Sequence, residues 1–497
     1  MPAPISEISA SSPSGKPAES RRWLKRRVPS EQLYLLAPPR LHPKRFGAVD
    51  FPDRLRHVLR AWWFWLAVAM ALEWAGRRIA AISAGGLAFF QYHTSAQVHP
   101  AVYPLEGDLD VDSGEFQNTI EGVTGMPFVD GNRVEVYNNG DEFYPAMLDA
   151  IESAEQSITM EQYIYWDGEV GRRFAEAFAE KARRGVEVKL LLDAIGSSTL
   201  GKEIFRILAA GGCQLAWFRP IHWYTLHRAN RRDHRKSLIV DGRIAFTGGA
   251  GLADHWLGSA TDATEWRDIQ VAITGPAALA QQSGFALNWL ETTGEILSGE
   301  RFFPEPRSEQ GESDGLKVQT ILSSPSLGLG AVGTMYLAAV QCAKRELLIA
   351  NPYFIPDTRV IGMLAAARRR GVEVKLMVAG GHIDAWWARQ NSVRLYGRLL
   401  EAGIEIYEFR PTMLHQKTML VDGIWATVGT ANFDNRSFAL NEETNLCFHD
   451  RAIAGELRAI FSADLARCDR VELDEWRRRG VWQRTMEQCA SLLEDQL

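Results

Sequence analysis

The chain has 497 residues, of which 46% are hydrophobic, and a formal net charge of −6 at pH 7. This length exceeds what one hydrophobic core fills, so we expect two domains or two fused repeats with extensions. An acidic net charge provides no general attraction to nucleic acid. The cysteines are odd in number and lack C-x-x-C spacing, which indicates reduced, mostly buried thiols and no zinc site. They are Cys213, Cys342, Cys447, Cys468 and Cys489.

Residues 1–118 are predicted to form a basic, partly apolar N-terminal extension. Residues 1–60 are rich in proline, serine and basic residues, which predicts a poorly ordered cationic arm. Two apolar runs follow, at Ala61–Leu72 and Ile79–Phe90, and tryptophans are concentrated around the first. Each run is shorter than the roughly 20 residues of a spanning helix. They predict either an in-plane or re-entrant membrane segment or a helical hairpin packed on the catalytic body.

A first repeat is predicted at residues 119–297, because strand and helix patterns alternate there. The expected strands are 134–137, 158–164 and 186–193, and the expected helices between them are 141–154 and 171–184. This β-α-β-α-β order is typical of an α/β sheet covered by helices.

A second repeat is predicted at residues 317–472, after an exposed linker at 298–316 that is rich in Pro, Glu, Ser and Gly. The alternation of the first repeat returns. The expected helices are 331–345, 358–370 and 385–402, and the expected strands are 346–350, 372–378 and 404–409. A charged amphipathic helix is expected within the C-terminal segment 473–497, from about Leu473 to Leu493.

Two copies of the pattern H-x-K-x-x-x-x-D show that the repeats are related. One chance copy in a chain of this length is expected only about a few per cent of the time. The defining residues are His234, Lys236 and Asp241 in the first copy and His415, Lys417 and Asp422 in the second. The heptapeptide Arg-Gly-Val-Glu-Val-Lys-Leu precedes each copy, at 184–190 and 370–376. The sequence therefore predicts a duplicated enzyme in which each half supplies one histidine and one lysine to a shared site.

Histidine and lysine two positions apart on a strand face the same side of the sheet. Lys236 and Lys417 carry a compact positive charge that suits the oxygens of a phosphate. One histidine can attack phosphorus while the other protonates the leaving alcohol and later deprotonates the incoming hydroxyl. The pattern predicts phosphodiester transfer without a metal or other cofactor, because the lysines neutralise the developing charge.

The acidic residues near the motifs fall into two groups. Asp241 and Asp422 each precede a glycine between two apolar runs, so they either form hairpin turns or take part in catalysis. Asp268 and Glu443 each open an alternating strand soon after a histidine. A carboxylate there can accept the second ring N–H, fix the tautomer and stabilise the imidazolium. The alternative for both is a solvated surface position.

With these motifs the chain resembles the phospholipase D superfamily, and within it the bacterial cardiolipin synthases, over about residues 119–470. Besides the two motifs, the resemblance rests on Asn139-Gly140, Ala182–Val186, Asn351–Pro356, Leu400–Gly403 and Gly429–Ser437. It implies two tandem α-β-α-β-α sandwich repeats with pseudo-two-fold symmetry. It also implies phosphatidyl transfer between lipid head groups through a phosphohistidine.

The resemblance implies roles for particular residues. His234 is the expected nucleophile and His415 the expected acid and base. Asn432 matches an asparagine that contacts the phosphate in the family pattern. The first copy carries Gly251 at the corresponding place, so one phosphate contact is expected to be missing.

Together these features predict a phosphatidyltransferase at the bacterial inner membrane, attached peripherally or through the N-terminal apolar segment. The expected partners are phospholipid substrates and an anionic membrane surface, and not nucleic acid. A phospholipase D that uses water, a phosphodiester nuclease and a scaffold with a decayed site are the alternatives. The acidic charge and the apolar arm weigh against the nuclease, and the complete set of histidines and lysines weighs against the scaffold.

A segment that mixes aromatic and basic residues lies just before the first motif. Trp217–Leu226, followed by Arg228, Arg231 and Arg232, predicts a loop that either dips into an anionic lipid surface or borders the active site. The histidines expected to be ordinary surface or core residues are His222, His227, His255 and His382.

Overall fold

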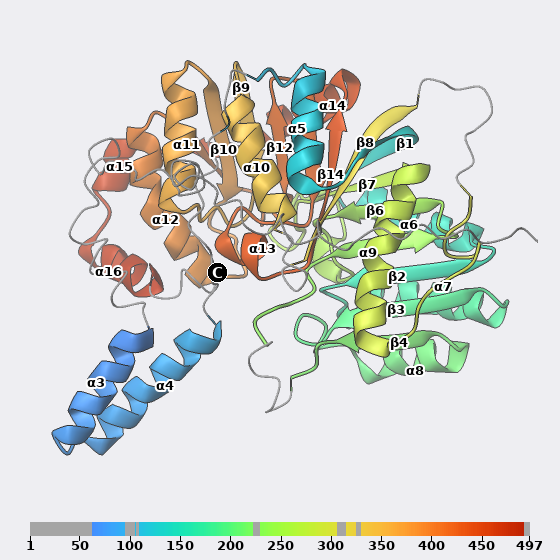
Figure 1. Cartoon of the computed structure of the whole chain (residues 1–497), viewed down its shortest axis with the longest axis horizontal. Coiled ribbons are helices and arrows are strands. Elements are labelled where there is room, and N and C mark those ends of the chain that lie inside the picture. Colours follow the sequence, from blue (N-terminus) through green and yellow to red (C-terminus); the bar gives the residue numbers. More distant parts are fainter. Residues whose placement is uncertain are drawn as a thin grey trace, which may run out of the picture. The chain divides into compact units, whose positions relative to one another are not determined.

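The computed structural model of the chain describes residues 62–94, 105, 109–221, 229–305, 315–324 and 330–491. The chain divides into two compact units, Met1–Phe51 and Pro52–Leu497. The first unit, and with it the cationic arm predicted at residues 1–60, lies outside the described residues. All elements below belong to the second unit (Figure 1).

A sheet of 15 strands organises the described residues. Its two central strands, β1 (Phe128–Asn138) and β8 (Leu316–Ser323), pair antiparallel. Outward from β1 follow β7 (Ile269–Thr274), β6 (Ile244–Gly248), β5 (Lys236–Val240), β2 (Ser157–Gln162), β3 (Glu187–Asp193) and β4 (Gln214–Phe218). Outward from β8 follow β14 (Glu443–His449), β13 (Trp425–Gly429), β12 (Thr418–Val421), β9 (Glu346–Ala350), β10 (Glu373–Ala379), β11 (Glu405–Phe409) and β15 (Cys468–Arg470).

The two halves of the sheet correspond strand for strand from the centre outward, except that β15 at the edge of the second half has no counterpart. The strands that follow the His-x-Lys motifs, β5 and β12, pair antiparallel with β2 and β9. From there β2, β3 and β4 run parallel, as do β9, β10 and β11. An approximate two-fold axis therefore passes between β1 and β8, and the predicted pseudo-symmetric tandem repeat is confirmed.

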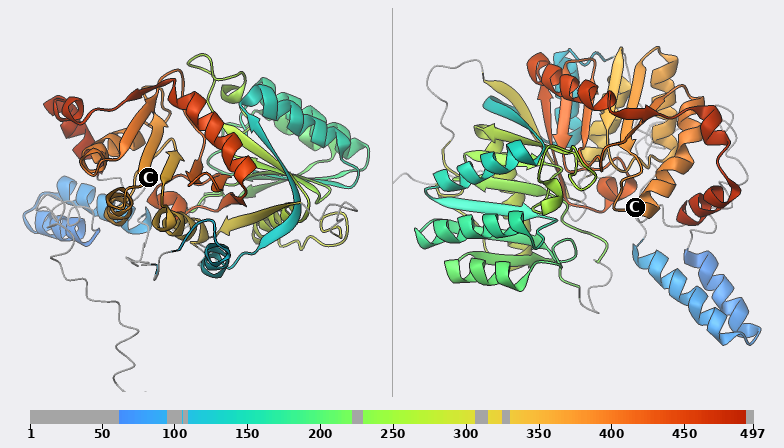
Figure 2. Two further views of the ribbon diagram at one scale, coloured as in Figure 1. Left: turned by 90° about the horizontal axis from the view of Figure 1, so that it is seen from above. Right: turned by 180° about the vertical axis from the view of Figure 1, so that it is seen from behind.

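Helices cover both faces of each half of the sheet (Figure 2). In the first half, α6 (Gly140–Ser153), α7 (Glu169–Arg183) and α8 (Lys202–Gly211) cover one face and α9 (Pro276–Thr293) covers the other. In the second half, α10 (Ala331–Cys342), α11 (Thr358–Arg369) and α12 (Trp386–Glu401) cover one face and α14 (Arg451–Leu465) the other. Because both faces of the sheet are buried, strands such as β3 and β9 consist largely of apolar residues.

The duplicated heptapeptide has a conformational role. Gly185 and Gly371, with φ of +93° and +95°, follow helices α7 and α11. This left-handed conformation favours glycine and ends a helix sharply. The chain can then turn directly into the buried strand that the rest of the heptapeptide forms.

Some boundaries differ from those predicted. Helix α5 (Gly114–Thr124) starts inside the predicted extension and packs through Phe116 and Ile120 on the core of the second repeat. The predicted linker is exposed at residues 298–301, but Phe302 is 3% exposed and packs in the α9 core of the first repeat. The C-terminal segment forms two helices, α15 (Leu473–Arg477) and α16 (Val481–Ala490), since Gly480 between them is extended.

The two apolar N-terminal runs form helices α3 (Trp62–Trp74) and α4 (Arg78–Thr94), which pack against each other. Small side chains fill the contact; they are Ala69, Ala81, Ala84 and Ala88, each under a tenth exposed. Large apolar side chains point outward; they are Leu66, Met70, Trp74, Ile82 and Phe89. Within the described ranges, no helix combines the length and apolarity needed to cross a bilayer.

Candidate active site

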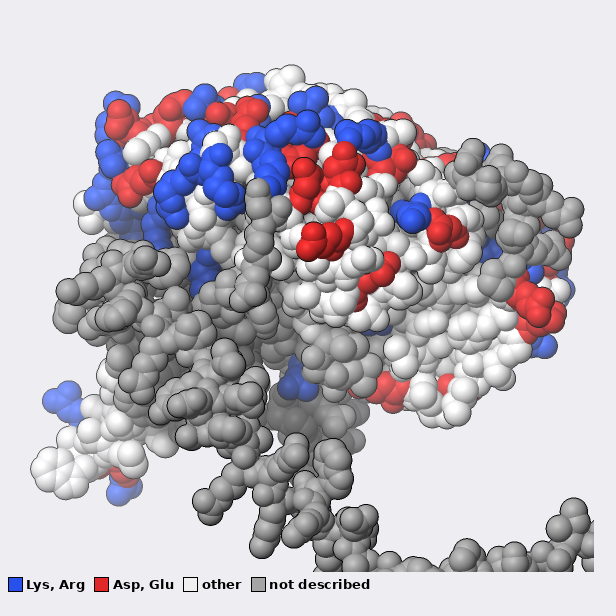
Figure 3. Space-filling model, turned by 45° about the horizontal axis from the view of Figure 1, so that its top comes forward, with Lys and Arg blue, Asp and Glu red and all other residues white. Residues whose placement is uncertain are grey.

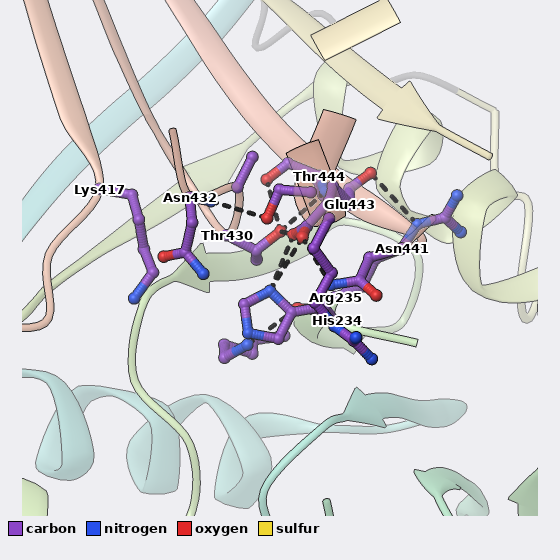
Figure 4. A network of polar contacts seen from close by, with 12 residues as sticks. His234, Arg235, Lys417, Thr430, Asn432, Asn441, Glu443 and Thr444 are labelled. Carbon is purple, nitrogen blue, oxygen red and sulfur yellow. Dashed lines mark hydrogen bonds and ion pairs between the residues drawn. The ribbon is translucent and has the colours of Figure 1, made fainter. Parts of the chain in front are cut away.

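His234 is held by a carboxylate from the other repeat. It lies just before β5, and its Nδ1 is 3.0 Å from both carboxylate oxygens of Glu443, the first residue of β14 (Figure 4). Thr430 Oγ1 donates a hydrogen bond to Glu443, and Asn441 Nδ2 donates another at 3.4 Å. A carboxylate at Nδ1 keeps the ring proton there, so Nε2 retains a lone pair for attack.

His415 is held in the same way by the first repeat. Its Nδ1 lies 2.8 Å from Asp268 Oδ2, and the same oxygen accepts a hydrogen bond from Trp256 Nε1 at 2.9 Å. Trp256, in the short helix η3 (Asp254–Trp256), is fully buried, and its ring centre is 5.3 Å from that of His415. The ring of Trp266 lies 5.5 Å from the same imidazole. Two indoles and a carboxylate therefore enclose His415.

Backbone hydrogen bonds also join each histidine to the repeat that supplies its carboxylate. The N–H of His234 donates to the carbonyl of Glu442 at 3.0 Å, and the N–H of His415 donates to the carbonyl of Arg267 at 2.7 Å. Glu443 and Asp268, which bond the imidazoles, thus each directly follow the residue whose carbonyl accepts the backbone N–H of the same histidine. Neither repeat by itself contains a complete histidine–carboxylate pair.

Lys236 and Lys417 lie beside the imidazoles. Lys236 Nζ donates to the carbonyl of His234 at 2.8 Å and lies 5.4 Å from the ring centre of Tyr163. Lys417 Nζ donates to the carbonyl of His415 and lies 3.0 Å from the Nδ1 of that residue. Burial lowers the pKa of Lys236 to about 8 and that of Lys417 to about 7, and the charge of Lys236 further lowers the latter. The two amines therefore share one cleft, and a bound anion would favour their charged forms.

Both imidazoles are neutral at pH 7. Burial lowers the pKa of His234 to about 4; Glu443 opposes this effect, and Lys236 adds to it. Burial, followed by the charge of Lys417, lowers the pKa of His415 to about 4. Burial alone would raise the pKa of Glu443, but the neighbouring His234 lowers this pKa to about 2. A neutral imidazole with a fixed tautomer is the form that can attack phosphorus.

The aspartates that end the two motifs lie at the far end of their strands from the histidines. The Asp241 carboxylate accepts hydrogen bonds from the backbone amides of residues 155–157, at 2.7 to 2.9 Å. The Asp422 carboxylate accepts from the amides of residues 344–346 over the same range. Both aspartates have a left-handed φ, of 53° and 56°. This corrects the catalytic role considered for them, because they form turns and bind the loop that enters β2 or β9.

Packing explains why a side chain, and with it a phosphate contact, is missing at Gly251. A Cβ at this residue would lie 2.8 Å from the Cβ and 2.9 Å from the carbonyl oxygen of Ile164. Its counterpart Asn432 is 7% exposed, and its Oδ1 is buried without a hydrogen-bond partner among the described residues. In Figure 4, the side chains of Asn432 and Lys417 both point toward the region that contains His234.

A buried ionic network that the sequence did not predict lies beneath His234. Arg232, for which the sequence predicted a loop that meets lipid or borders the active site, is fully buried and pairs with Asp193 at 2.9 Å. Arg235 lies 3.4 Å from Glu442. The equivalent positions of the second repeat are uncharged; they are Ala379 for Asp193, Met413 for Arg232, Leu414 for Asp233 and Gln416 for Arg235. The two histidines therefore occupy different electrostatic surroundings within a symmetric fold.

Other sequence predictions have mixed outcomes. Trp217 and Phe218 belong to β4 and not to a loop, and residues 222–228, which include His222 and His227, lie outside the described residues. His255 stacks on Trp266 at 5.1 Å, as a packed histidine would, and His382 is exposed. Of the cysteines, only Cys342 and Cys447 are fully buried. In the part of the chain that the structure describes, no cluster of His, Cys, Asp or Glu could hold a metal ion.

Comparisons with known proteins agree with this geometry. Residues 147–277 and 336–465 match the family model described as cardiolipin synthase, PLD-like domain. A cardiolipin synthase of Clostridium perfringens is 34% identical over 73% of this chain and 76% of its own length. The major cardiolipin synthase of Bacillus subtilis is 32% identical over 74% of this chain and 76% of its own length. The crystal structure of a phosphatidylserine synthase from Haemophilus influenzae covers 77% of this chain and 100% of its own, with a TM-score of 0.58 and 13% identity, and shares its fold.

The tandem fold and the paired His-x-Lys motifs are those of the phospholipase D class of enzymes. Within that class, the chain belongs to the cardiolipin synthase, PLD-like family, and it is a phospholipid phosphatidyltransferase. The resemblance inferred from the motifs is thereby confirmed.

Proposed function

We propose that the enzyme transfers a phosphatidyl group from a donor phospholipid to a hydroxyl of phosphatidylglycerol or a related alcohol, through a phosphohistidine at His234. His234 Nε2 attacks phosphorus, and the P–N bond forms as the P–O bond to the leaving alcohol breaks. His415 acts here as the imidazolium, since only that form carries a proton on Nε2, and it gives this proton to the leaving oxygen. The acceptor hydroxyl then returns a proton to His415 and attacks phosphorus, which breaks the P–N bond and frees His234.

One observation carries this proposal: each imidazole has its Nδ1 bonded to a buried carboxylate, which leaves Nε2 as the nitrogen available for chemistry, and Nε2 of His415 lies 3.1 Å from Lys417 Nζ. Glu443 and Asp268 fix the tautomers and would stabilise an imidazolium. Lys236, Lys417 and Asn432 supply groups for the phosphate oxygens, because the charge of two ammonium groups offsets the charge that develops in the transition state.

The asymmetric surroundings support unequal roles for the two histidines. His415 is enclosed by two indoles, and this apolar enclosure suits a residue that must gain and lose a proton reversibly. His234 rests on a charged network and presents one edge to Tyr163, at 5.0 Å between ring centres. We therefore assign attack to His234 and proton transfer to His415.

Trapping the covalent intermediate tests the assignment. Wild-type enzyme given phosphatidylglycerol labelled in its head group should release the labelled glycerol and form cardiolipin. Quenching in alkali, in which phosphohistidine survives, followed by mass spectrometry should place the adduct on His234. His234→Ala should give no adduct, whereas His415→Ala should slow both its formation and its breakdown. An adduct on His415 in the wild-type protein would reverse the two roles.

Hydrolysis by water is the second candidate, because water can use the same machinery as an alcohol. It is distinguished by product: phosphatidic acid in place of cardiolipin at the same rate of glycerol release. A nuclease is disfavoured, since Lys and Arg side chains lie among Asp and Glu side chains on the face shown in Figure 3. Such a mixture produces no continuous basic track for a polynucleotide backbone.

We also propose that the α3–α4 hairpin attaches the enzyme to the bacterial inner membrane. The hairpin is apolar on the outside, with Met70 61% and Ile82 73% exposed, and has alanines at its helix contact. Small residues at the contact and large apolar residues outside are the arrangement of helices packed in lipid. Met70→Lys with Ile82→Lys should shift full-length protein toward the soluble fraction. The matched change Glu73→Lys should not, because Glu73 is already polar and exposed.

A further inference from the structure

The established reaction places a physical demand on the cleft. Phosphatidyl transfer uses lipids with two acyl chains, and every methylene of a chain is stabilised by the bilayer interior. Removing a whole lipid from the bilayer for each turnover would be prohibitive. The histidines must therefore act on a head group while its chains stay in the membrane, so the mouth of the cleft has to meet the lipid surface.

The loop between β10 and α12 forms one rim of this mouth. Asp384 in this loop accepts a hydrogen bond from the hydroxyl of Tyr353. Ile383, the preceding residue, packs against the core cluster that contains Tyr163 and Met413, which places the loop beside the two His-x-Lys motifs. Arg389 fixes the base of the loop, since its Nε donates to the carbonyl of Gly380 at 2.7 Å.

Two indole side chains stand exposed directly after Asp384. Trp386 is 43% and Trp387 45% exposed, and their rings pack edge to face with centres 4.7 Å apart. They begin α12, whose next residue, Ala388, is buried. The pair is therefore anchored on a fixed helix end and still presents apolar surface next to the cleft.

The corresponding loop of the first repeat, between β3 and α8, forms the opposite rim. Gly196 packs so closely on Tyr163 that a Cβ there would lie 2.7 Å from the Tyr163 ring, which in turn contacts His234. Ile195, the preceding residue, is 38% exposed. Both rims thus carry large exposed apolar side chains, at the carboxyl ends of equivalent strands.

We propose that Trp386 and Trp387, with Ile195 across the cleft, are an interfacial docking surface that seats the mouth of the active site on a phospholipid bilayer. Indole rings are favoured at the membrane–water interface because they combine an apolar body with a polar N–H. These side chains lie on or next to the loops that border the proposed catalytic groups, and the phospholipid substrate of those groups identifies lipid as the occupant. The inference rests on phosphatidyl transfer as the reaction of this site.

The test compares full-length Trp386→Ser/Trp387→Ser with wild type on two forms of one substrate. One is phosphatidylglycerol in bilayer vesicles; the other is dihexanoyl phosphatidylglycerol dissolved as monomers. The docking surface predicts about tenfold slower turnover on vesicles, the effect of losing one well-buried apolar contact, and unchanged turnover on monomers. Trp482→Ser is the matched control, because Trp482 is 74% exposed at the start of α16. It should change neither rate.

Two further arms make the result decisive. Trp386→Phe/Trp387→Phe should keep most of the vesicle activity, since phenyl rings also enter the interface. Binding to vesicles, measured without turnover, should weaken for Trp386→Ser/Trp387→Ser and not for Trp482→Ser. This measurement tests the docking surface even if the reaction is not phosphatidyl transfer. Equal loss on vesicles and monomers, or no loss on vesicles, overturns the proposal. A change in oligomeric state, with an unchanged ratio of the vesicle rate to the monomer rate, also overturns the proposal, because the indoles would then contact a second copy of the chain.

Discussion

Glu443 of the second repeat accepts a hydrogen bond from the imidazole of His234 in the first repeat, at 3.0 Å from Nδ1. The reciprocal bond joins His415 to Asp268. The proposed catalytic unit is therefore built by exchange across the two-fold axis, and separation of the repeats would break both histidine–carboxylate pairs at once. Since the carboxylates are buried with their imidazoles, their replacement leaves each ring without the group that sets its tautomer.

Glu443→Gln should lower turnover by about 10²–10⁴, the range seen when a carboxylate that orients a catalytic histidine becomes an amide. The burst of covalent intermediate should slow in parallel, because the affected ring is His234. Asp268→Asn should lower turnover similarly but act through His415, so breakdown of the intermediate should slow as well. Rapid-quench kinetics on both variants checks this. Equal effects of Glu443→Gln on formation and breakdown would contradict the assignment.

The lysines should impose an alkaline limit on activity. Lysine is charged below its pKa, and burial holds the pKa of Lys417 at about 7 in the free enzyme. The value of kcat/KM should therefore fall as pH rises above about 7. Lys417→Met should lose about 10²–10³ in turnover at every pH, the usual cost of one preorganised contact. Lys417→Arg, although weaker than wild type, should move the alkaline fall up to about pH 8, the pKa of Lys236, because guanidinium does not titrate there.

Trp256 should act on His415 through Asp268. Trp256→Phe removes the N–H that donates to Asp268 Oδ2 at 2.9 Å and keeps an aromatic ring against the imidazole. The freed carboxylate oxygen carries more charge toward His415, so the pKa of His415 should rise and the limb of the pH profile that reports loss of the His415 proton should move upward. We expect kcat to fall about tenfold, the effect of one hydrogen bond to a charged group, with KM unchanged. Trp266→Phe is the control, because that ring packs on the same imidazole.

Asp241 should matter for stability and little for chemistry. Asp241→Ala leaves the amides of residues 155–157 without their acceptor and places alanine at a φ of 53°. The free energy of unfolding should fall by about 1–3 kcal/mol, measured by denaturant titration, while turnover of the folded protein stays nearly unchanged. Asp241→Asn, which tolerates the left-handed turn and keeps one acceptor oxygen, should be the milder variant. A large loss of kcat without loss of stability would restore a catalytic role.

The sequence by itself determined the repeat, the alternation of strands and helices and the identity of the histidines and lysines. These follow from local spacing: period two places His234 and Lys236 on one face, and the period of the helix shows where α6, α7 and α11 lie. Predicted and observed bounds of these elements agree within about two residues, whereas α8, α9 and α14 were not predicted.

Only the tertiary structure decided which acid serves which histidine, because Glu443 and His234 are 209 residues apart and meet only when the two halves of the sheet pack together. The same holds for Trp256 at Asp268, for the steric exclusion of a side chain at Gly251, and for the burial of Arg232 against Asp193. Local pattern encodes the period of each element. The partner of a buried charge is selected by packing between elements that are distant in the chain, because an unpaired charge there would cost too much free energy to persist.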